Sequence, residues 1–180
     1  MPQVLPEFPR FISYGHRAAY LGPAAIMAHQ PCSVIDIGCG DGVGYHALVT
    51  HQALGSYFGI DISPAEIEKG QRLLVDQHKH KTVCGNWLEY PEKDLEPADF
   101  VFCVEVLEHV PLDLRKMFVE KCVRFAKKNI IISTPPADRN PHGKLTIPEC
   151  LELLRSSGLD VVPIDVQWTT MYVCSAGSKK

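Results

Sequence analysis

Residues 33–42 read SVIDIGCGDG, and this stretch decides the fold class. Its first half contains three β-branched residues, Val34, Ile35 and Ile37, which favour a buried strand. The glycines that follow predict a tight turn before a helix expected over residues 43–53. Glycine tolerates positive φ and lets a ligand touch the backbone where a Cβ would block it. The stretch therefore predicts a strand, a ligand-binding turn and a helix in direct succession.

The rest of the chain continues this alternation. Further strands are expected at 57–61, 81–84, 99–104 and 129–134, and further helices at 64–77, at 112–126 and from the Thr146 cap to 156. The last two strands, 160–165 and 170–174, have no helix between them and should form an antiparallel hairpin. The pattern predicts an α/β fold, a three-layer, doubly wound, mostly parallel seven-stranded sheet with that C-terminal hairpin.

A chain of 180 residues fits one domain, placed at 31–180 with the N-terminal segment 1–30 as part of it. Residues 13–29 predict a helix kinked near Pro23. Seven cysteines without a C-x-x-C pair, and no signal peptide within residues 1–10, favour a reduced cytoplasmic location.

Charge and hydropathy argue against nucleic acid and membranes as partners. The net charge of -3 and the pI of about 6.2 give no general attraction to nucleic acid or anionic membranes. No apolar stretch approaches the roughly 20 residues of a membrane span. The basic run over residues 115–128 is expected to be a solvated helix face rather than a contact for RNA or a carrier protein.

The glycine turn does not match a nicotinamide-binding site. That turn reads G-x-G-x-x-G, whereas Val43 stands at the sixth position counted from Gly38. Asp61 ends the next predicted strand, 19 residues after Gly42. A carboxylate there can accept both hydroxyls of a ribose, and it would repel a 2′-phosphate.

The segments VIDIGCGDG and GIDIS closely resemble the first two motifs of class I S-adenosylmethionine-dependent methyltransferases. The resemblance implies S-adenosylmethionine as cofactor. It assigns cofactor-binding roles to Asp36, Gly38, Cys39, Gly40, Gly42, Asp61 and the adjacent Ile62. It also places the adenine beside Asn86 and Trp87, after the third strand. Trp87 is equally well explained as a core aromatic.

The segment EVLEHV, residues 105–110, resembles small-molecule methyltransferases, including ubiquinone-type O-methyltransferases. In a helical turn, Glu105, Glu108 and His109 would share one face. One interpretation makes Glu105 and Glu108 capping or polar-network residues beside the cofactor, with Glu105 contacting it and His109 packed against the loop. A second makes His109 a general base supported by Glu108, because imidazole exchanges protons near neutral pH. In the third, all three hold a divalent metal.

The metal interpretation is similar to small-RNA 2′-O-methyltransferases, which add a second histidine after the fifth strand. His142 is the only candidate, and its surroundings lack the D-H-K-F-E-W-like context of those enzymes. Amino-methyltransferases carry an Asn/Asp-Pro-Pro-aromatic motif after the fourth strand. Here the pair Pro135-Pro136 follows the fifth predicted strand, which disfavours that group. The resemblance to the small-molecule group covers about residues 30–175 and includes the "TP" and "TPEEL"-like segments near Thr134 and Thr146.

The favoured hypothesis is a methyltransferase acting on an oxygen or nitrogen of a small-molecule acceptor. A metal-dependent RNA 2′-O-methyltransferase is the second hypothesis. A partner-dependent or non-catalytic subunit is the third, because about 30 residues before the first strand leave no dedicated substrate lid. No pattern identifies the acceptor or the oligomeric state.

Overall fold

The computed structural model describes residues 31–50, 54–72, 74, 76, 78–134, 145–166 and 169–176. The predicted N-terminal helix, the Pro135-Pro136 pair and His142 lie outside these residues. No described helix is long and apolar enough to cross a membrane.

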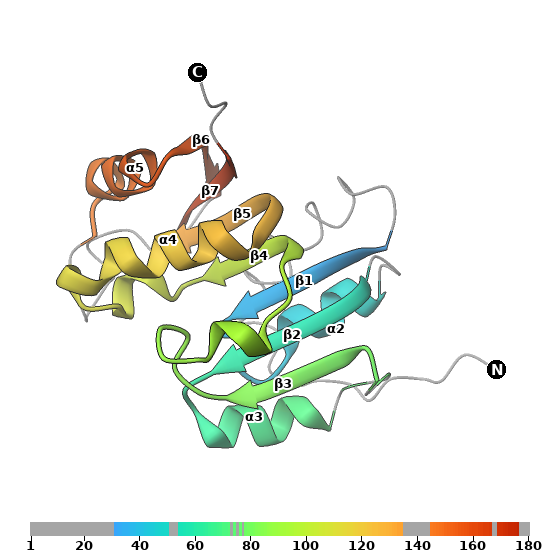
Figure 1. Ribbon diagram of the computed structural model, residues 1–180. Helices are drawn as coiled ribbons and strands as arrows, with labels where there is room; N and C mark the ends of the chain where they lie inside the picture. Colours follow the sequence, from blue (N-terminus) through green and yellow to red (C-terminus); the bar gives the residue numbers. More distant parts are fainter. Residues whose placement is uncertain are drawn as a thin grey trace.

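Seven strands form one sheet in the order β3-β2-β1-β4-β5-β7-β6. The first five strands are parallel, and β7 runs antiparallel to both β5 and β6 (Figure 1). This confirms the predicted sheet and its C-terminal hairpin. The strands are β1 (Cys32–Ile37), β2 (Leu54–Asp61), β3 (His80–Cys84), β4 (Ala98–Val104), β5 (Ala126–Thr134), β6 (Leu159–Val166) and β7 (Thr169–Ala176).

Four helices connect the described strands: α2 (Val43–Thr50), α3 (Pro64–Gln71), α4 (Arg115–Phe125) and α5 (Ile147–Ser156). Three short 3-10 turns are η1 (Glu92–Asp94), η2 (Leu107–His109) and η3 (Leu112–Leu114). The predicted Thr146 cap is present and forms a capping box with Glu149, and Ser63 caps α3 by accepting from the Glu66 N–H.

Two predicted helices are shorter than expected. The helix predicted over 64–77 ends at Gln71, and a turn around Asp76 precedes β3, with the His80 N–H donating to the Asp76 carbonyl at 2.7 Å. The helix predicted over 112–126 begins as a 3-10 turn and ends at Phe125, because Ala126 already pairs with Ala98 in the sheet.

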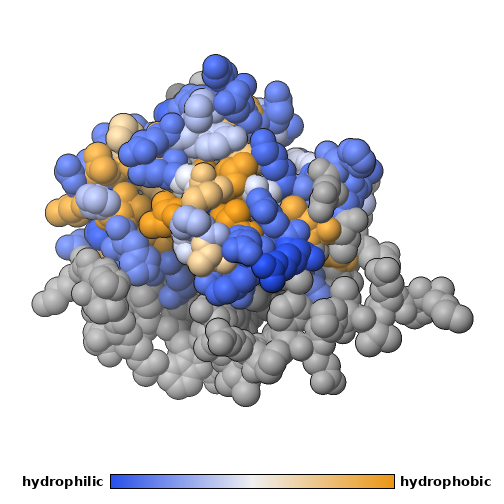
Figure 2. All heavy atoms as spheres, turned by 90° about the horizontal axis from the view of Figure 1, so that it is seen from below, coloured by the Kyte–Doolittle hydropathy of each residue, from blue (hydrophilic) through white to orange (hydrophobic). Residues whose placement is uncertain are grey.

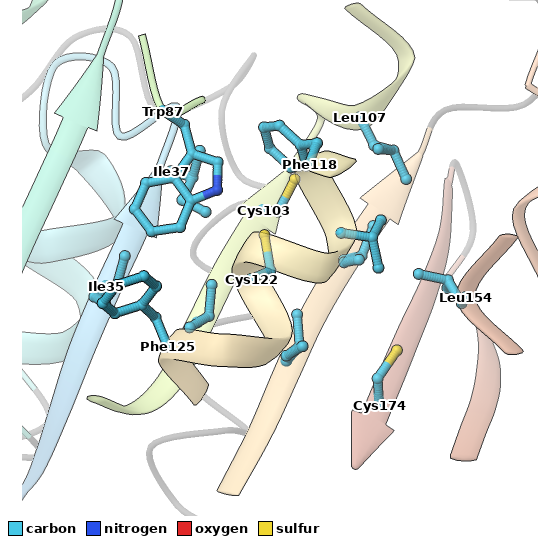
Figure 3. Packing of buried hydrophobic residues seen from close by; sticks show 14 of the residues in the cluster. Ile35, Ile37, Trp87, Cys103, Leu107, Phe118, Cys122, Phe125, Leu154 and Cys174 are labelled. Atoms are coloured by element: carbon cyan, nitrogen blue, oxygen red, sulfur yellow. The ribbon is translucent and has the colours of Figure 1, made fainter. Parts of the chain in front are cut away.

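The sheet is buried on both faces, as the apolar strands predicted. In β4, Val101 and Cys103 belong to the cluster under α4 and α5, whereas Phe100 and Phe102 belong to the cluster under α2 and α3. Figure 3 shows the first cluster, in which side chains of α4 lie against those of the central strands. Alternate residues of one strand thus fill two separate cores.

The seven cysteines are all free thiols, and six of them are buried. Burial raises the pKa of Cys122, Cys150 and Cys174 to about 12, so these thiols behave as small apolar side chains. Cys103 is buried in the same way, whereas Cys84 ends an edge strand and is exposed.

A polar connection joins β1, β4 and β5 at the end of the sheet opposite the glycine turn. Asp99 Oδ2 accepts hydrogen bonds from the Ser33 N–H at 2.9 Å and from its hydroxyl at 3.0 Å. Lys128 Nζ lies 3.0 Å from Asp99 Oδ1. The bond from the Ser33 backbone and the nearby lysine lower the pKa of the Asp99 carboxyl. The ionised form is therefore favoured in the folded chain.

We expect Asp99→Ala to lower the free energy of unfolding at pH 7 by about 1–3 kcal/mol, because it leaves the partly buried donors of Ser33 unpaired. A carboxyl with a lowered folded pKa stabilises above its unfolded pKa and loses that contribution as pH falls through the folded value. The deficit should therefore shrink between pH 7 and pH 3, measured by denaturant titration. Asp160→Ala, on an exposed position of β6, is the control. An equal deficit at both pH values would contradict a role for the charge.

Candidate functional site

The glycine turn is fixed against the end of β2. The N–H groups of Gly38 and Cys39 both donate to the Ile60 carbonyl, at 2.7 and 3.2 Å. Gly38 has a φ of 71°, and a Cβ added to it would lie 2.2 Å from Cγ2 of Val106. Only glycine therefore fits where β1 ends beside the segment that follows β4.

Helix α3 packs on the outer side of this turn. A Cβ on Gly70 would lie 3.2 Å from the Asp41 carbonyl carbon and 3.4 Å from the Gly40 oxygen. Gly70 was not among the predicted site residues. The available signal was a glycine inside a capped helix, which costs helix stability and requires a packing reason.

Asp61 connects the turn to the start of α3. Its Oδ2 accepts from the Gly40 N–H at 2.9 Å, and its Oδ1 accepts from the Ser63 N–H at 2.8 Å. A carboxylate oxygen has two lone pairs, so each oxygen can also accept from a ribose hydroxyl. The two backbone bonds orient the carboxylate for that contact.

A cavity of about 450 Å³ opens at the carboxyl ends of β1, β2, β3 and β4, which is the size range of ligand sites. Strand order switches direction between β1 and β4, the position where such sheets bind ligands. The predicted site residues in its wall are Gly38, Asp61, Ile62, Asn86, Trp87, Glu105 and His109.

The other predicted site residues do not line the cavity: Asp36, Cys39, Gly40, Gly42 and Glu108. Asp36 is buried and its Oδ2 accepts from the Tyr57 hydroxyl at 2.8 Å. Cys39 is fully buried under Gly59. Asp36 and Cys39 therefore support the turn from within the core. Side chains alternate between the two faces of a sheet, so not every residue near a strand end can face the cavity.

Sequence reasoning missed the apolar part of the wall. Val106, Val110, Pro111, Leu114 and Phe118 come from the segment after β4 and from the start of α4. No sequence motif marks these apolar residues as part of a site, so only the packing of α4 shows that they line the cavity. Figure 2, which views the molecule of Figure 1 from below, shows apolar residues at the left, in the middle and at the right of that face, among hydrophilic ones.

Trp87 is both a core residue and part of the cavity wall. It is 3% exposed, and its ring meets that of Phe125 edge-on, with the centroids 5.9 Å apart (Figure 3). Asn86 is exposed, and its side chain folds back on its own turn. Its Oδ1 accepts from the Leu88 N–H at 3.1 Å, and its Nδ2 donates to Glu89 at 3.2 Å. The core interpretation of Trp87 therefore fits, and the wall position remains compatible with an adenine contact.

The segment EVLEHV begins with a strained residue. Glu105 has a φ of 56°, the one positive φ at a non-glycine residue within the described chain. Its N–H donates to the carbonyl and the hydroxyl oxygen of Ser133, each at 3.2 Å, and the Ser133 hydroxyl donates to Glu105 Oε1 at 3.2 Å. Ser133, at the end of β5, thus holds this conformation and was not predicted.

The expectation that Glu105, Glu108 and His109 share one face is wrong. Glu105 leaves the helical region, and residues 107–109 form a 3-10 turn that rotates successive side chains further apart. Glu108 is 2% exposed, whereas the His109 side chain is 53% exposed, and their Oε1 and Nε2 atoms are 4.0 Å apart. Within the described residues, no three potential ligands cluster as a metal site.

The prediction that the basic run at 115–128 is a solvated face holds for Lys116, Arg124, Lys127 and Lys128, which are exposed, and is wrong for the other two cations. Arg115 and Lys121 are buried. Arg124 pairs with Glu92 at 2.5 Å, and Lys128 pairs with Asp99. The helix packs the side chains of Arg115 and Lys121 against neighbouring segments, which a charge count along the sequence does not show.

Residues 35–130 match the family model of a methyltransferase domain. The chain belongs to this methyltransferase family. Its cofactor is therefore S-adenosylmethionine, as the first two motifs implied.

Two curated relatives with different named activities match the chain. A small RNA 2′-O-methyltransferase of Arabidopsis thaliana is 30% identical over 138 residues, 71% of this chain and 14% of its own length. A ubiquinone biosynthesis O-methyltransferase of Coxiella burnetii is 32% identical over 94 residues, 52% of this chain and 38% of its own. The chain thus spans less than half of either relative.

The fold is shared with magnesium protoporphyrin IX methyltransferase from Synechocystis PCC 6803, whose structure contains bound S-adenosylmethionine. The two superpose with a TM-score of 0.72 at 16% identity, over 96% of this chain and 86% of the other.

We expect Gly38→Ala to weaken binding of S-adenosylhomocysteine at least about tenfold, measured by calorimetry. The added methyl group meets Val106 and narrows the turn. Gly158→Ala is the matched control, because Gly158 also has a positive φ, of 81°, yet has open space around it. Both variants should lose about 1–2 kcal/mol of stability from the backbone conformation. Equal affinities for the two variants would show that the close contact is irrelevant to the cofactor.

Proposed function

We propose that this protein transfers a methyl group from S-adenosylmethionine to an oxygen or nitrogen of a small-molecule acceptor. The observation that carries the proposal is that His109, an exposed imidazole, lines the same cavity as Gly38 and Asp61. A proton-accepting group and the cofactor-binding turn therefore face one space.

The residues of the cavity fit the cofactor in kind and position. Asp61 would accept the ribose hydroxyls, and the turn at Gly38 leaves room for the amino-acid and ribose parts to approach the backbone. Asn86, Ile62 and Trp87 would form the adenine side. The bound cofactor supplies an electrophilic methyl on a sulfonium, so the chain's own residues need only bind, orient and exclude water.

His109 is proposed to take the acceptor's proton on its imidazole. As the proton leaves, the acceptor's electron pair forms the new bond to the methyl carbon, and the bond from that carbon to sulfur breaks. Glu108 lies behind the imidazole, with its Oε1 4.0 Å from His109 Nε2, where a carboxylate stabilises the imidazolium that forms. Glu105 is proposed to contact the cofactor from its strained position beside Ser133.

Support for a small acceptor comes from the EVLEHV segment and from the ubiquinone biosynthesis relative. The Arabidopsis relative supports RNA as a second candidate, over a larger share of the chain. The basic run offers few cations to RNA, because Arg115 and Lys121 are buried and Arg124 and Lys128 pair with acids, which leaves the exposed Lys116 and Lys127. We therefore place the small molecule first.

The test measures methyl transfer from radiolabelled S-adenosylmethionine to a panel of catechols, other phenols and amines, and to short RNA duplexes with a free 3′ end. Transfer to a small molecule that survives a chelator is the expected result. Transfer only to RNA, abolished by the chelator, would favour the second candidate. Calorimetry showing no binding of S-adenosylmethionine would support a non-catalytic subunit.

We expect His109→Gln to lower kcat for the identified acceptor by about 10²–10⁴-fold, the usual contribution of a general base. Binding of S-adenosylhomocysteine should stay within about threefold, because the imidazole acts on the acceptor. His78→Gln, on an exposed turn before β3, is the control. An unchanged kcat for His109→Gln would remove the base from the mechanism.

A further inference from the structure

Lys121 of α4 is a buried cation that holds the turn after β3. It is 3% exposed, and its Nζ donates to the carbonyls of Trp87 at 2.7 Å, Leu88 at 3.4 Å and Tyr90 at 2.7 Å. An ammonium has three N–H donors, and three carbonyl oxygens receive them. The same Nζ lies 5.0 Å from the centre of the Trp87 ring.

Arg115, at the start of α4, makes equivalent contacts with the other wall of the cavity. It is 5% exposed, its Nε donates to the Val110 carbonyl at 2.9 Å, and its Nη2 donates to the Glu108 carbonyl at 3.2 Å. Phe118 lies three residues from each cation and lines the cavity. Residues at this spacing are neighbours on a helix surface, so the three form one stripe.

Stability alone does not explain Lys121. Desolvating an ammonium is costly, and replacing a buried charge with a well-packed apolar side chain is often neutral or stabilising. Burial lowers the pKa of Lys121, and the nearby charges of Glu92 and Arg124 bond to each other at the surface. The hydrogen bonds of Lys121 go to the turn after β3, which carries Asn86 and Trp87 into the cavity wall.

We propose that α4 is the positioning helix of the cofactor cavity, with Lys121 fixing the turn that presents Asn86 and Trp87, and Arg115 fixing the segment that presents His109. Neither cation lines the cavity, and each acts through backbone carbonyls. The inference rests on the proposed use of this cavity for S-adenosylmethionine.

Affinity for S-adenosylhomocysteine and for 5′-methylthioadenosine, measured by calorimetry on the full chain, tests the role of Lys121. Lys121→Met keeps the unbranched side chain but removes the donors, and it should weaken both ligands at least about tenfold, because a small displacement of a binding wall is costly. Lys121→Arg retains donors and charge and should recover most of the loss. Lys116→Met, on the exposed face of the same helix, should bind as the wild type does.

Hydrogen exchange separates positioning from general destabilisation. The N–H groups of Glu89 and Tyr90 donate to the Asn86 carbonyl, and those of His109 and Val110 donate within the segment held by Arg115. Lys121→Met should speed exchange at residues 88–90 and leave 109–110 unchanged. Arg115→Met should do the reverse, with affinity for S-adenosylhomocysteine within about threefold of wild type.

Wild-type affinity in Lys121→Met, or faster exchange throughout the chain in both variants, would overturn the inference. If Lys121→Met does not fold, Lys121→Gln takes its place in the same two measurements. A wild-type chain that binds neither ligand would refute the proposed function itself, a result distinct from failure of the variants.

Discussion

The close approach of Gly38 to Val106 is the contact on which the site depends. It brings the end of β1 against the segment that leaves β4, at the position where strand order switches. The two N–H bonds to the Ile60 carbonyl add the end of β2 to the same point. Three strand ends are thereby fixed around one cavity, and a side chain on Gly38 would separate them.

Around this contact, hydrogen bonds fix the positions of the residues that line the cavity. Ser133 stabilises the positive φ of Glu105, the Gly40 and Ser63 amides orient Asp61, and Lys121 gathers the carbonyls of the turn after β3. Apart from the bond between Asp61 and the Ser63 N–H two residues away, each is a bond between a side chain and the backbone of a distant segment. Such bonds fix where a segment lies without adding a group to the cavity, so they leave the chemistry to a few exposed atoms.

The fold was predictable because its signals are local and agree with one another. β-branched runs, the glycine turn, and the Ser63 and Thr146 caps each specify one element, and the alternation of elements specifies a parallel sheet. Predictions that depended on how segments pack in the tertiary structure were less accurate. EVLEHV was expected to present its acids on one face with His109, but Glu105 turned toward Ser133 and Glu108 became buried.

The sequence by itself determined the sheet, the glycine turn and the methyltransferase family with its cofactor. Each of these is specified by a short pattern of residues: a β-branched strand, the glycine turn that follows it, and the acid at the end of the next strand. Only the tertiary structure decided which predicted residues face the cavity and which, like Asp36, support it from behind. It also decided that Arg115 and Lys121 lie inside, because burial depends on the elements packed against a helix and not on the charges along it.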